Sequence, residues 1–183
     1  FGLSTYDLSY GTTITVHDSP LYTSGSQPVG KSSHEAVQNF IAAGVAPAKI
    51  NIGAPFYAQR WAGETALHDT ATANAFTAVT YRSLSGASST TEPTGALYDA
   101  TAKAAYITGD PFTSFSSVQA ITDKIAYINS SGVGGIILWE IGQIYFSATT
   151  PHFPHMEAFA GETAIRGASA GVGSVTGLST LTL

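Results

Sequence analysis

The chain has 183 residues and contains no cysteine, and Asp, Glu, Lys and Arg together make up only 10% of it. The absence of cysteine excludes a disulfide framework, a thiolate nucleophile and a cysteine-based zinc site. The 7 Lys and Arg residues are scattered and are outnumbered by 12 Asp and Glu residues, so the sequence does not indicate a nucleic-acid partner. No apolar run approaches the roughly 20 residues of a membrane-spanning helix, which argues against a membrane partner as well.

The composition fits one globular domain, because 44% of the residues are hydrophobic and 11% are aromatic. Phe1 stands where an initiating Met would be, which predicts a processed or excised piece of a soluble protein. The sequon Asn129-Ser130-Ser131, together with the Ser-, Thr-, Gly- and Ala-rich composition, favours a secreted protein. A chance match to so short a pattern is the alternative.

The first third of the chain has a strand, helix, strand pattern. A short apolar stretch over residues 1–7 predicts a strand, and a polar loop follows it. Apolar residues at helical spacing predict a helix over residues 32–43, which starts with a capping box of Ser32 and Glu35. Residues 49–54 predict a second strand. Strand, helix and strand in this order form a βαβ unit, so we expect the two strands to be parallel.

The pattern changes between residues 62 and 112, where short segments are broken by glycine and proline. This region predicts an inserted antiparallel or α+β lobe. A helix pattern returns at Val118, with Ser116 and Gln119 as its capping box. The apolar run over residues 136–140 is then typical of a strand covered on both faces.

We therefore expect an α/β fold divided into four segments. Residues 1–61 hold two strands with their connecting helix, and residues 62–112 form the lobe. Residues 113–150 hold the last helix and the last strand, and residues 151–183 form a C-terminal helix, tail or linker. Three parallel strands do not close a barrel of eight, so the sheet is open or the chain is part of a barrel.

Four local patterns follow one another along roughly residues 1–145. They are Thr5-Tyr6-Asp7, His17 to Tyr22, Ala42 to Tyr57, and Tyr127 to Gln143. In this order they resemble M-T-Y-D, H-N-A-P-L-Y, A-G-V-P-x-x-K-[IL]-x-[IL]-G-x-P-F-Y and Y-I-x-x-x-G-[LV]-G-G-x-x-x-W-E-[LI]-G-Q of the chitinase-type enzymes, the family 18 glycoside hydrolases. The resemblance implies the last three strands of a partial (β/α)8 TIM barrel, with a small lobe inserted before the eighth strand.

The resemblance also implies hydrolysis of β-1,4 bonds between N-acetylglucosamine units, with retention and without a cofactor or metal. Tyr6 and Asp7 would hold and polarise the substrate's acetamide group, which is the nucleophile. Trp139 would stack on a sugar ring, and Tyr57 and Trp61 would line the site. A strand-end Tyr packed in the core, an Asp that caps a turn and a Trp that is part of the core are the structural alternatives.

The chain departs from the family where the catalytic acid is concerned. The motif D-x-x-D-x-D-x-E does not occur in it, so we expect the acid to come from residues upstream of Phe1, in a missing N-terminal barrel half, and the chain alone to be inactive. Ala58-Gln59 stands where the family often has Gly-Arg. The alternatives are a non-catalytic carbohydrate-binding protein and an assembly protein in which a partner chain covers the sheet edges.

A competing motif lies between the first strand and the first helix. Gly25 to Ser32 satisfies G-x-x-x-x-G-K-S, the phosphate loop of nucleotide-binding proteins. Pro28 removes one backbone N–H donor from that loop, and polar residues precede it instead of a buried strand. We therefore expect no nucleotide site. The 5 His residues lack metal-ligand spacing, so we expect no metal site either.

Overall fold

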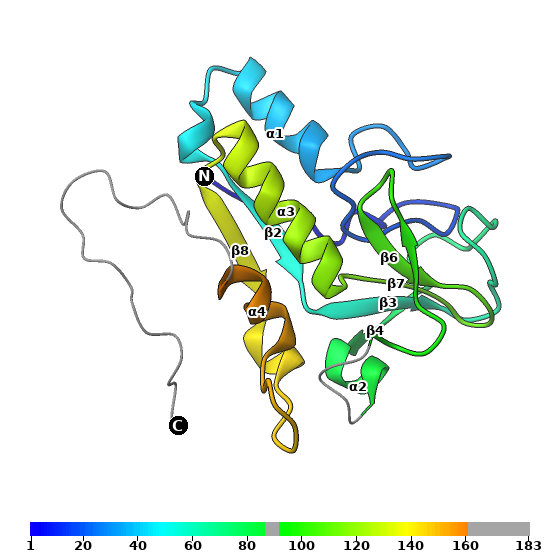
Figure 1. Ribbon diagram of the computed structural model, residues 1–183. Coiled ribbons are helices and arrows are strands. Elements are labelled where there is room, and N and C mark those ends of the chain that lie inside the picture. Colours follow the sequence, from blue (N-terminus) through cyan, green and yellow to red (C-terminus); the bar gives the residue numbers. More distant parts are fainter. Residues whose placement is uncertain (87–91, 161–183) are drawn as a thin grey trace.

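The structure is a computed structural model, and it describes residues 1–86 and 92–160. The expected Gly-, Ser- and Thr-rich tail over residues 161–183 lies outside the described residues. Two sheets with different strand directions make up the fold (Figure 1). One sheet is parallel, and the other is antiparallel and inserted between two strands of the first. The α/β class and the inserted lobe are thus confirmed.

The parallel sheet has the strand order β1-β2-β8. Its strands are β1 (Gly2–Leu3), β2 (Asn51–Pro55) and β8 (Gly135–Trp139). Leu3 pairs with Ile52, and Pro55 pairs with Trp139. Both pairings are parallel, so the carboxyl ends of all three strands lie at one edge of the sheet.

Two helices cover one face of this sheet (Figure 1). They are α1 (Ser33–Ala42) and α3 (Val118–Ser131), and a 3-10 turn, η1 (Pro47–Lys49), leads into β2. Val37 from α1 and Ile128 from α3 pack on Ile52 of β2 in a shared core cluster. The apolar positions that predicted the two helices are the ones that reach the sheet.

The lobe is a five-stranded antiparallel sheet in the order β4-β3-β7-β6-β5. Its strands are β3 (Tyr57–Trp61), β4 (Thr77–Thr80), β5 (Leu97–Asp99), β6 (Ala104–Ile107) and β7 (Phe112–Phe115), and α2 (Tyr81–Ser85) follows β4. The sheet therefore extends beyond residues 62–112 at both ends. We propose that the lobe comprises residues 57–115, because β2 passes into β3 after a single residue, Phe56.

The last described residues fold back on the molecule. After β8 come the 3-10 turn η2 (Ile141–Ile144) and the helix α4 (Pro154–Ala160), which packs on α3. No helix among the described residues is long and apolar enough to cross a membrane.

The first capping residue was predicted correctly and the second was not. The Ser32 hydroxyl accepts a hydrogen bond from the Glu35 N–H at 3.3 Å and donates one to the Glu35 carboxylate at 2.7 Å. In α3 the cap is Ser117, which accepts from the Ala120 N–H at 3.1 Å. Ser116 lies one residue before the cap, where its carbonyl group accepts a hydrogen bond from His155 of α4 instead.

The expectation for β8 was also wrong in one respect. Its first four residues are half-buried and Trp139 is 55% exposed, so the strand is not covered on both faces. The reason is its position: β8 is an edge strand of the parallel sheet, paired only with β2 among the described residues.

The buried His155 makes the stability of the fold depend on pH. Burial lowers the pKa of His155 to about 4, compared with about 6.5 in an unfolded chain. Between these values the unfolded state binds a proton that the folded state does not, so stability falls as the pH decreases through this window. Across this window His155 lowers the free energy of unfolding by about 3 kcal/mol.

We expect His155→Gln to reduce this pH dependence. Urea unfolding of the wild type and the variant at about pH 7 and about pH 4 measures the difference. Between about pH 7 and about pH 4, the free energy of unfolding of the wild type should fall by about 3 kcal/mol more than that of the variant. Equal losses would mean that His155 does not titrate as a buried neutral group.

Candidate functional site

The candidate site lies where the carboxyl ends of the parallel strands meet the lobe. Trp139 ends β8, Pro55 ends β2 opposite it, and the chain leaving β1 reaches Asp7 four residues after Leu3. Tyr57 opens β3 directly after this edge. Residues from three separate parts of the sequence therefore converge, because parallel strands present their carboxyl ends at the same side.

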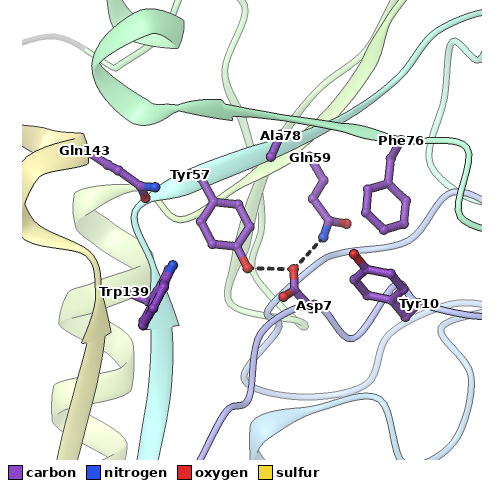
Figure 2. Close-up of a pocket in the computed structure, with 8 residues that line it drawn as sticks. All are labelled: Asp7, Tyr10, Tyr57, Gln59, Phe76, Ala78, Trp139 and Gln143. Atoms are coloured by element: carbon purple, nitrogen blue, oxygen red, sulfur yellow. Dashed lines mark hydrogen bonds between the residues drawn. The ribbon is translucent and has the colours of Figure 1, made fainter.

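A pocket of about 270 Å³ occupies this position. Figure 2 shows Asp7 and Tyr57 at its centre, with an aromatic pair on one side and Trp139 with Gln143 on the other. The aromatic pair is Tyr10 and Phe76, whose ring centroids are 5.0 Å apart in an edge-to-face arrangement. The complete lining consists of Asp7, Tyr10, Tyr57, Gln59, Phe76, Ala78, Trp139 and Gln143.

Asp7 is the acceptor of two hydrogen bonds from the lobe. The Tyr57 hydroxyl donates to Asp7 Oδ1 at 2.6 Å and the Gln59 Nε2 amide donates to the same oxygen at 2.9 Å (Figure 2). Burial, followed by the nearby charges of Asp18 and Asp7 and the bond to Asp7, raises the pKa of Tyr57 far above its usual value. Tyr57 is therefore protonated and remains a donor. Among the described residues no hydrogen bond goes to Asp7 Oδ2, so this oxygen is free to accept one from a ligand.

The backbone at Asp7 adopts a left-handed conformation, with φ of 58°. Residues other than glycine are uncommon there, and such positions persist where the surroundings hold them in place. Two contacts do so: the Leu8 N–H donates to the Asp18 carbonyl group at 3.1 Å, and the Tyr10 N–H donates to the Asp7 carbonyl group at 3.2 Å. The turn aims the carboxylate at β3.

Tyr6 lies beside the pocket and does not line it. Its ring covers Gly53 of β2 so closely that an added Cβ there would come within 2.7 Å of two ring carbons. The ring also packs edge-to-face on Tyr57, with 6.4 Å between the centroids. The prediction of a catalytic role for Tyr6 remains a prediction, and the glycine explains how its ring reaches this position.

Trp61 was expected to line the site, but in the structure it is a core residue. It is 2% exposed and packs with Phe112 and Ala71. The two-residue period of a strand places Trp61 on the same face of β3 as Tyr57. The physical reason for the difference is Phe76, whose ring lies 5.4 Å from that of Trp61 between centroids and itself lines the pocket.

Five further lining residues were not singled out from the sequence as site residues: Tyr10, Gln59, Phe76, Ala78 and Gln143. Gln59 could have been found, because it lies two residues after Tyr57 on the same face of β3. Gln143 could have been found from its fixed distance after Trp139 in the last family pattern. Tyr10 and Phe76 come from loops without regular periodicity, so no pattern pointed to them.

The phosphate-loop motif is held by contacts within the chain. No strand immediately precedes Gly25, and the Gln27 amide donates to the carbonyl groups of His17 and Lys31 at 3.1 Å and 3.0 Å. The Lys31 ammonium donates to the Tyr10 carbonyl group at 2.9 Å. The described residues also contain no group of three or more His, Asp and Glu side chains that could hold a metal ion.

The site therefore belongs to the class built at the carboxyl ends of parallel strands in α/β barrel proteins. The family model of the glycosyl hydrolases family 18 matches residues 1–143. The chain belongs to this family, and the predicted partial TIM barrel is confirmed.

Solved structures of chitinases and of a chitinase-like lectin resemble the chain. Chitinase ChiW from Paenibacillus sp. is 25% identical, with a TM-score of 0.74 over 91% of this chain and 20% of its own. The Group IV chitinase of Ostrinia furnacalis in complex with allosamidin is 26% identical, with a TM-score of 0.71 over 87% of this chain and 48% of its own. The chitinase-like agglutinin of Robinia pseudoacacia is 25% identical, with a TM-score of 0.65 over 87% of this chain and 46% of its own. The chain thus spans less than half the length of each of these structures.

The 2 tryptophans of the chain give a direct test of this site description. Trp139 is 55% exposed and Trp61 is 2% exposed. We expect Trp139→Phe to remove the fluorescence that acrylamide quenches readily, and Trp61→Phe to remove the protected, shorter-wavelength emission. Readily quenched fluorescence that persists in Trp139→Phe would contradict the placement of these two side chains.

Proposed function

We propose that the chain forms the sugar-holding part of a chitinase-type active site and binds an N-acetylglucosamine unit of chitin or its oligosaccharides. The observation that supports this proposal best is the meeting of the exposed Trp139 ring with the Tyr57–Asp7 hydrogen bond in one pocket. An apolar ring face suits the C–H face of a sugar ring, and aromatic surfaces at such sites bury large contact areas. The polar groups beside it suit the acetamide group.

Different polar groups are proposed to bind the two polar atoms of that acetamide group. Asp7 Oδ1 is occupied by its two donors, and Oδ2 is left to accept the acetamide N–H. The fixed donors keep the carboxylate oriented, so little reorganisation is needed when the acetamide oxygen attacks the anomeric carbon. Tyr6 is proposed to donate its hydroxyl hydrogen to the acetamide oxygen. Reaction through the substrate's own acetamide is one of the exceptions to catalysis by two carboxylates.

We place the acid that protonates the leaving oxygen on a barrel strand outside these 183 residues, because the D-x-x-D-x-D-x-E motif does not occur in them. β1 and β8 are the two edges of the parallel sheet. These edges are where further barrel strands, from the same protein or a partner chain, would pair. We also propose that the protein is exported, as its sequon and composition suggest.

A non-catalytic sugar-binding protein is the second candidate. Gln59, where the family often has Arg, is 1% exposed and donates to Asp7, so the Asp7 carboxylate is held by neutral donors. The chain also resembles a chitinase-like agglutinin. Both observations fit a site that binds sugar without cleaving it.

Hydrolysis distinguishes the two candidates. We expect no cleavage of N-acetylglucosamine oligomers by the 183 residues alone, and cleavage when a barrel segment carrying D-x-x-D-x-D-x-E precedes them. In that longer protein, Tyr6→Phe should lower kcat by about ten- to a thousandfold through lost electrostatic stabilisation. No activity in the folded longer protein would favour the binding function, and unchanged activity of the variant would remove Tyr6 from the mechanism.

Sugar binding by the chain itself depends on Trp139. We expect Trp139→Ala to abolish measurable binding of tri-N-acetylchitotriose in calorimetry, because the stacking surface is lost. Phe1→Ala is the matched control, since Phe1 is 63% exposed at the amino end of the parallel strands, away from the pocket. Equal affinity of both variants would place the sugar elsewhere.

A further inference from the structure

A second carboxyl group is buried next to the turn that holds Asp7. Asp18 is 2% exposed, and its carboxyl oxygens are buried without a partner that meets hydrogen-bond geometry. The Asp7 N–H and the Ser9 hydroxyl face this carboxyl group. A buried charge without strong donors is costly, so the arrangement raises the question of which protonation state Asp18 adopts.

The hydrogen bonds next to Asp18 all run from donor to acceptor toward Asp7. The Ser9 hydroxyl donates to Gln59 Oε1, and the Gln59 Nε2 amide donates to Asp7 Oδ1 at 2.9 Å. The Tyr57 hydroxyl adds a second donor to the same oxygen at 2.6 Å. This chain of bonds ends on Asp7 Oδ1, which accepts from both Gln59 and Tyr57.

Ser9 determines what Asp18 can contribute. A hydroxyl group has one hydrogen and two lone pairs, and the hydrogen of Ser9 is used toward Gln59. Only the oxygen lone pairs of Ser9 remain for Asp18. If Asp18 were ionised, the lone pairs of its carboxylate would face the lone pairs of the Ser9 oxygen. A protonated Asp18 can instead donate its hydrogen to that oxygen.

We propose that Asp18 is a neutral carboxylic acid that donates to Ser9 and so begins a relay through Gln59 to the Asp7 carboxylate. In this relay Asp18 is a positioning residue: it orients Ser9 and Gln59, which orient Asp7. The hydrogen bonds from Ser9 to Gln59 and from Gln59 to Asp7 are present in the structure. The hydrogen bond from Asp18 to Ser9 is the proposal, and its effect on a sugar ligand rests on the proposed function.

The other groups around Asp18 agree with a neutral acid. Burial, reinforced by the Asp7 charge, raises the pKa of Asp18 to about 8. Lys124 of α3 is the nearby cation and lowers that pKa in part, but its ammonium group donates to Ser19 Oγ at 2.5 Å and to the Gly53 carbonyl group at 3.1 Å. Burial also lowers the pKa of Lys124 itself, to about 7.

Two more neighbours complete the surroundings of Asp18. Its backbone N–H donates to Ser114 Oγ of β7 at 2.9 Å, so the lobe holds its main chain. Tyr57 of β3 also lies near Asp18, and its hydroxyl remains protonated because its pKa is raised far above its usual value. Asp7, Tyr57 and Lys124 are thus the titratable groups that face Asp18.

The consequence is that Asp18 adds no charge beside the pocket at neutral pH. Above about pH 8 we expect Asp18 to ionise, which places a negative charge next to Asp7. The relay then loses its first donor, and we expect an N-acetylated sugar to bind more weakly, by up to about tenfold per pH unit if one proton is required.

Carbon-detected NMR of the Asp and Glu carboxyl groups tests the protonation state directly, without a sugar ligand. One carboxyl signal of the wild type should titrate near pH 8 and should be missing from Asp18→Asn. The exposed Glu157 provides the control, since Glu157→Gln should leave that signal in place. A wild type whose Asp18 signal titrates near pH 4, the usual range for Asp, would overturn the proposal.

The positioning role is tested by two replacements of similar size. Asp18→Asn keeps a donor for Ser9, and Asp18→Leu fills the space without one. Hydrogen exchange of the Gln59 side-chain amide should stay slow in Asp18→Asn and become at least tenfold faster in Asp18→Leu. Equal protection in the two folded variants would show that Asp18 only fills space. If Asp18→Leu does not fold, fast exchange in Asp18→Asn would still overturn the relay.

A sugar titration then separates the relay from the proposed function. Affinity for tri-N-acetylchitotriose should fall above pH 8 in the wild type and should not fall in Asp18→Asn. If no sugar binds at any pH while the carboxyl titration is as expected, the proposed function fails and the relay stands. If sugar binds with the same pH dependence in both proteins, the coupling between relay and ligand is wrong.

Discussion

The hydrogen bonds that Tyr57 and Gln59 donate to the Asp7 carboxylate connect the two sheets of the molecule. Asp7 follows the first strand of the parallel sheet, and both donors lie on the first strand of the lobe. Bonds to a charged acceptor contribute about 1.5–3 kcal/mol each, more than bonds between neutral groups. The same contacts that attach the lobe to the parallel sheet therefore orient the carboxylate in the pocket.

A layer of buried polar groups lies next to this contact. Lys124 reaches from α3 to Ser19 and to the Gly53 carbonyl group, and Thr5 exchanges two hydrogen bonds with Gly53 at 2.9 Å and 3.0 Å. These bonds tie the ends of β1 and β2 together just before Asp7. A buried layer of this kind specifies one arrangement, because each unpaired group in it would be costly.

Much of the fold followed from local patterns in the sequence. The helix from Ser33 to Ala42 was predicted by its apolar spacing and its Ser32 cap, and β2 and β8 were predicted by short apolar runs. The lobe that we propose, residues 57–115, is wider than the predicted 62–112, because only Phe56 separates β2 from β3. The sequence offered both Ser116 and Ser117 as caps of α3, and the structure uses Ser117, while the Ser116 carbonyl group accepts from the distant His155.

The residues of the candidate site were predictable only where they belong to one of the family patterns in the sequence. Asp7, Tyr57 and Trp139 were identified through their family patterns, and the structure brings all three into one pocket. Trp61 does not line this pocket, because strand periodicity gives the face of a side chain but not what packs on it, and Phe76 packs on Trp61. The relay from Asp18 could not have been predicted, since it joins two loops and a strand through single side chains.

The most direct test of this account is mapping of a sugar ligand on the chain. Amide and indole NMR shifts should be recorded while tri-N-acetylchitotriose is added. We expect the largest shifts on the Trp139 indole and on the backbone amides of Asp7, Tyr57 and Gln59. Shifts that are absent, or that fall on the second cavity beside Tyr98 and Gln119, would contradict the assignment of the pocket at the strand ends as the sugar site.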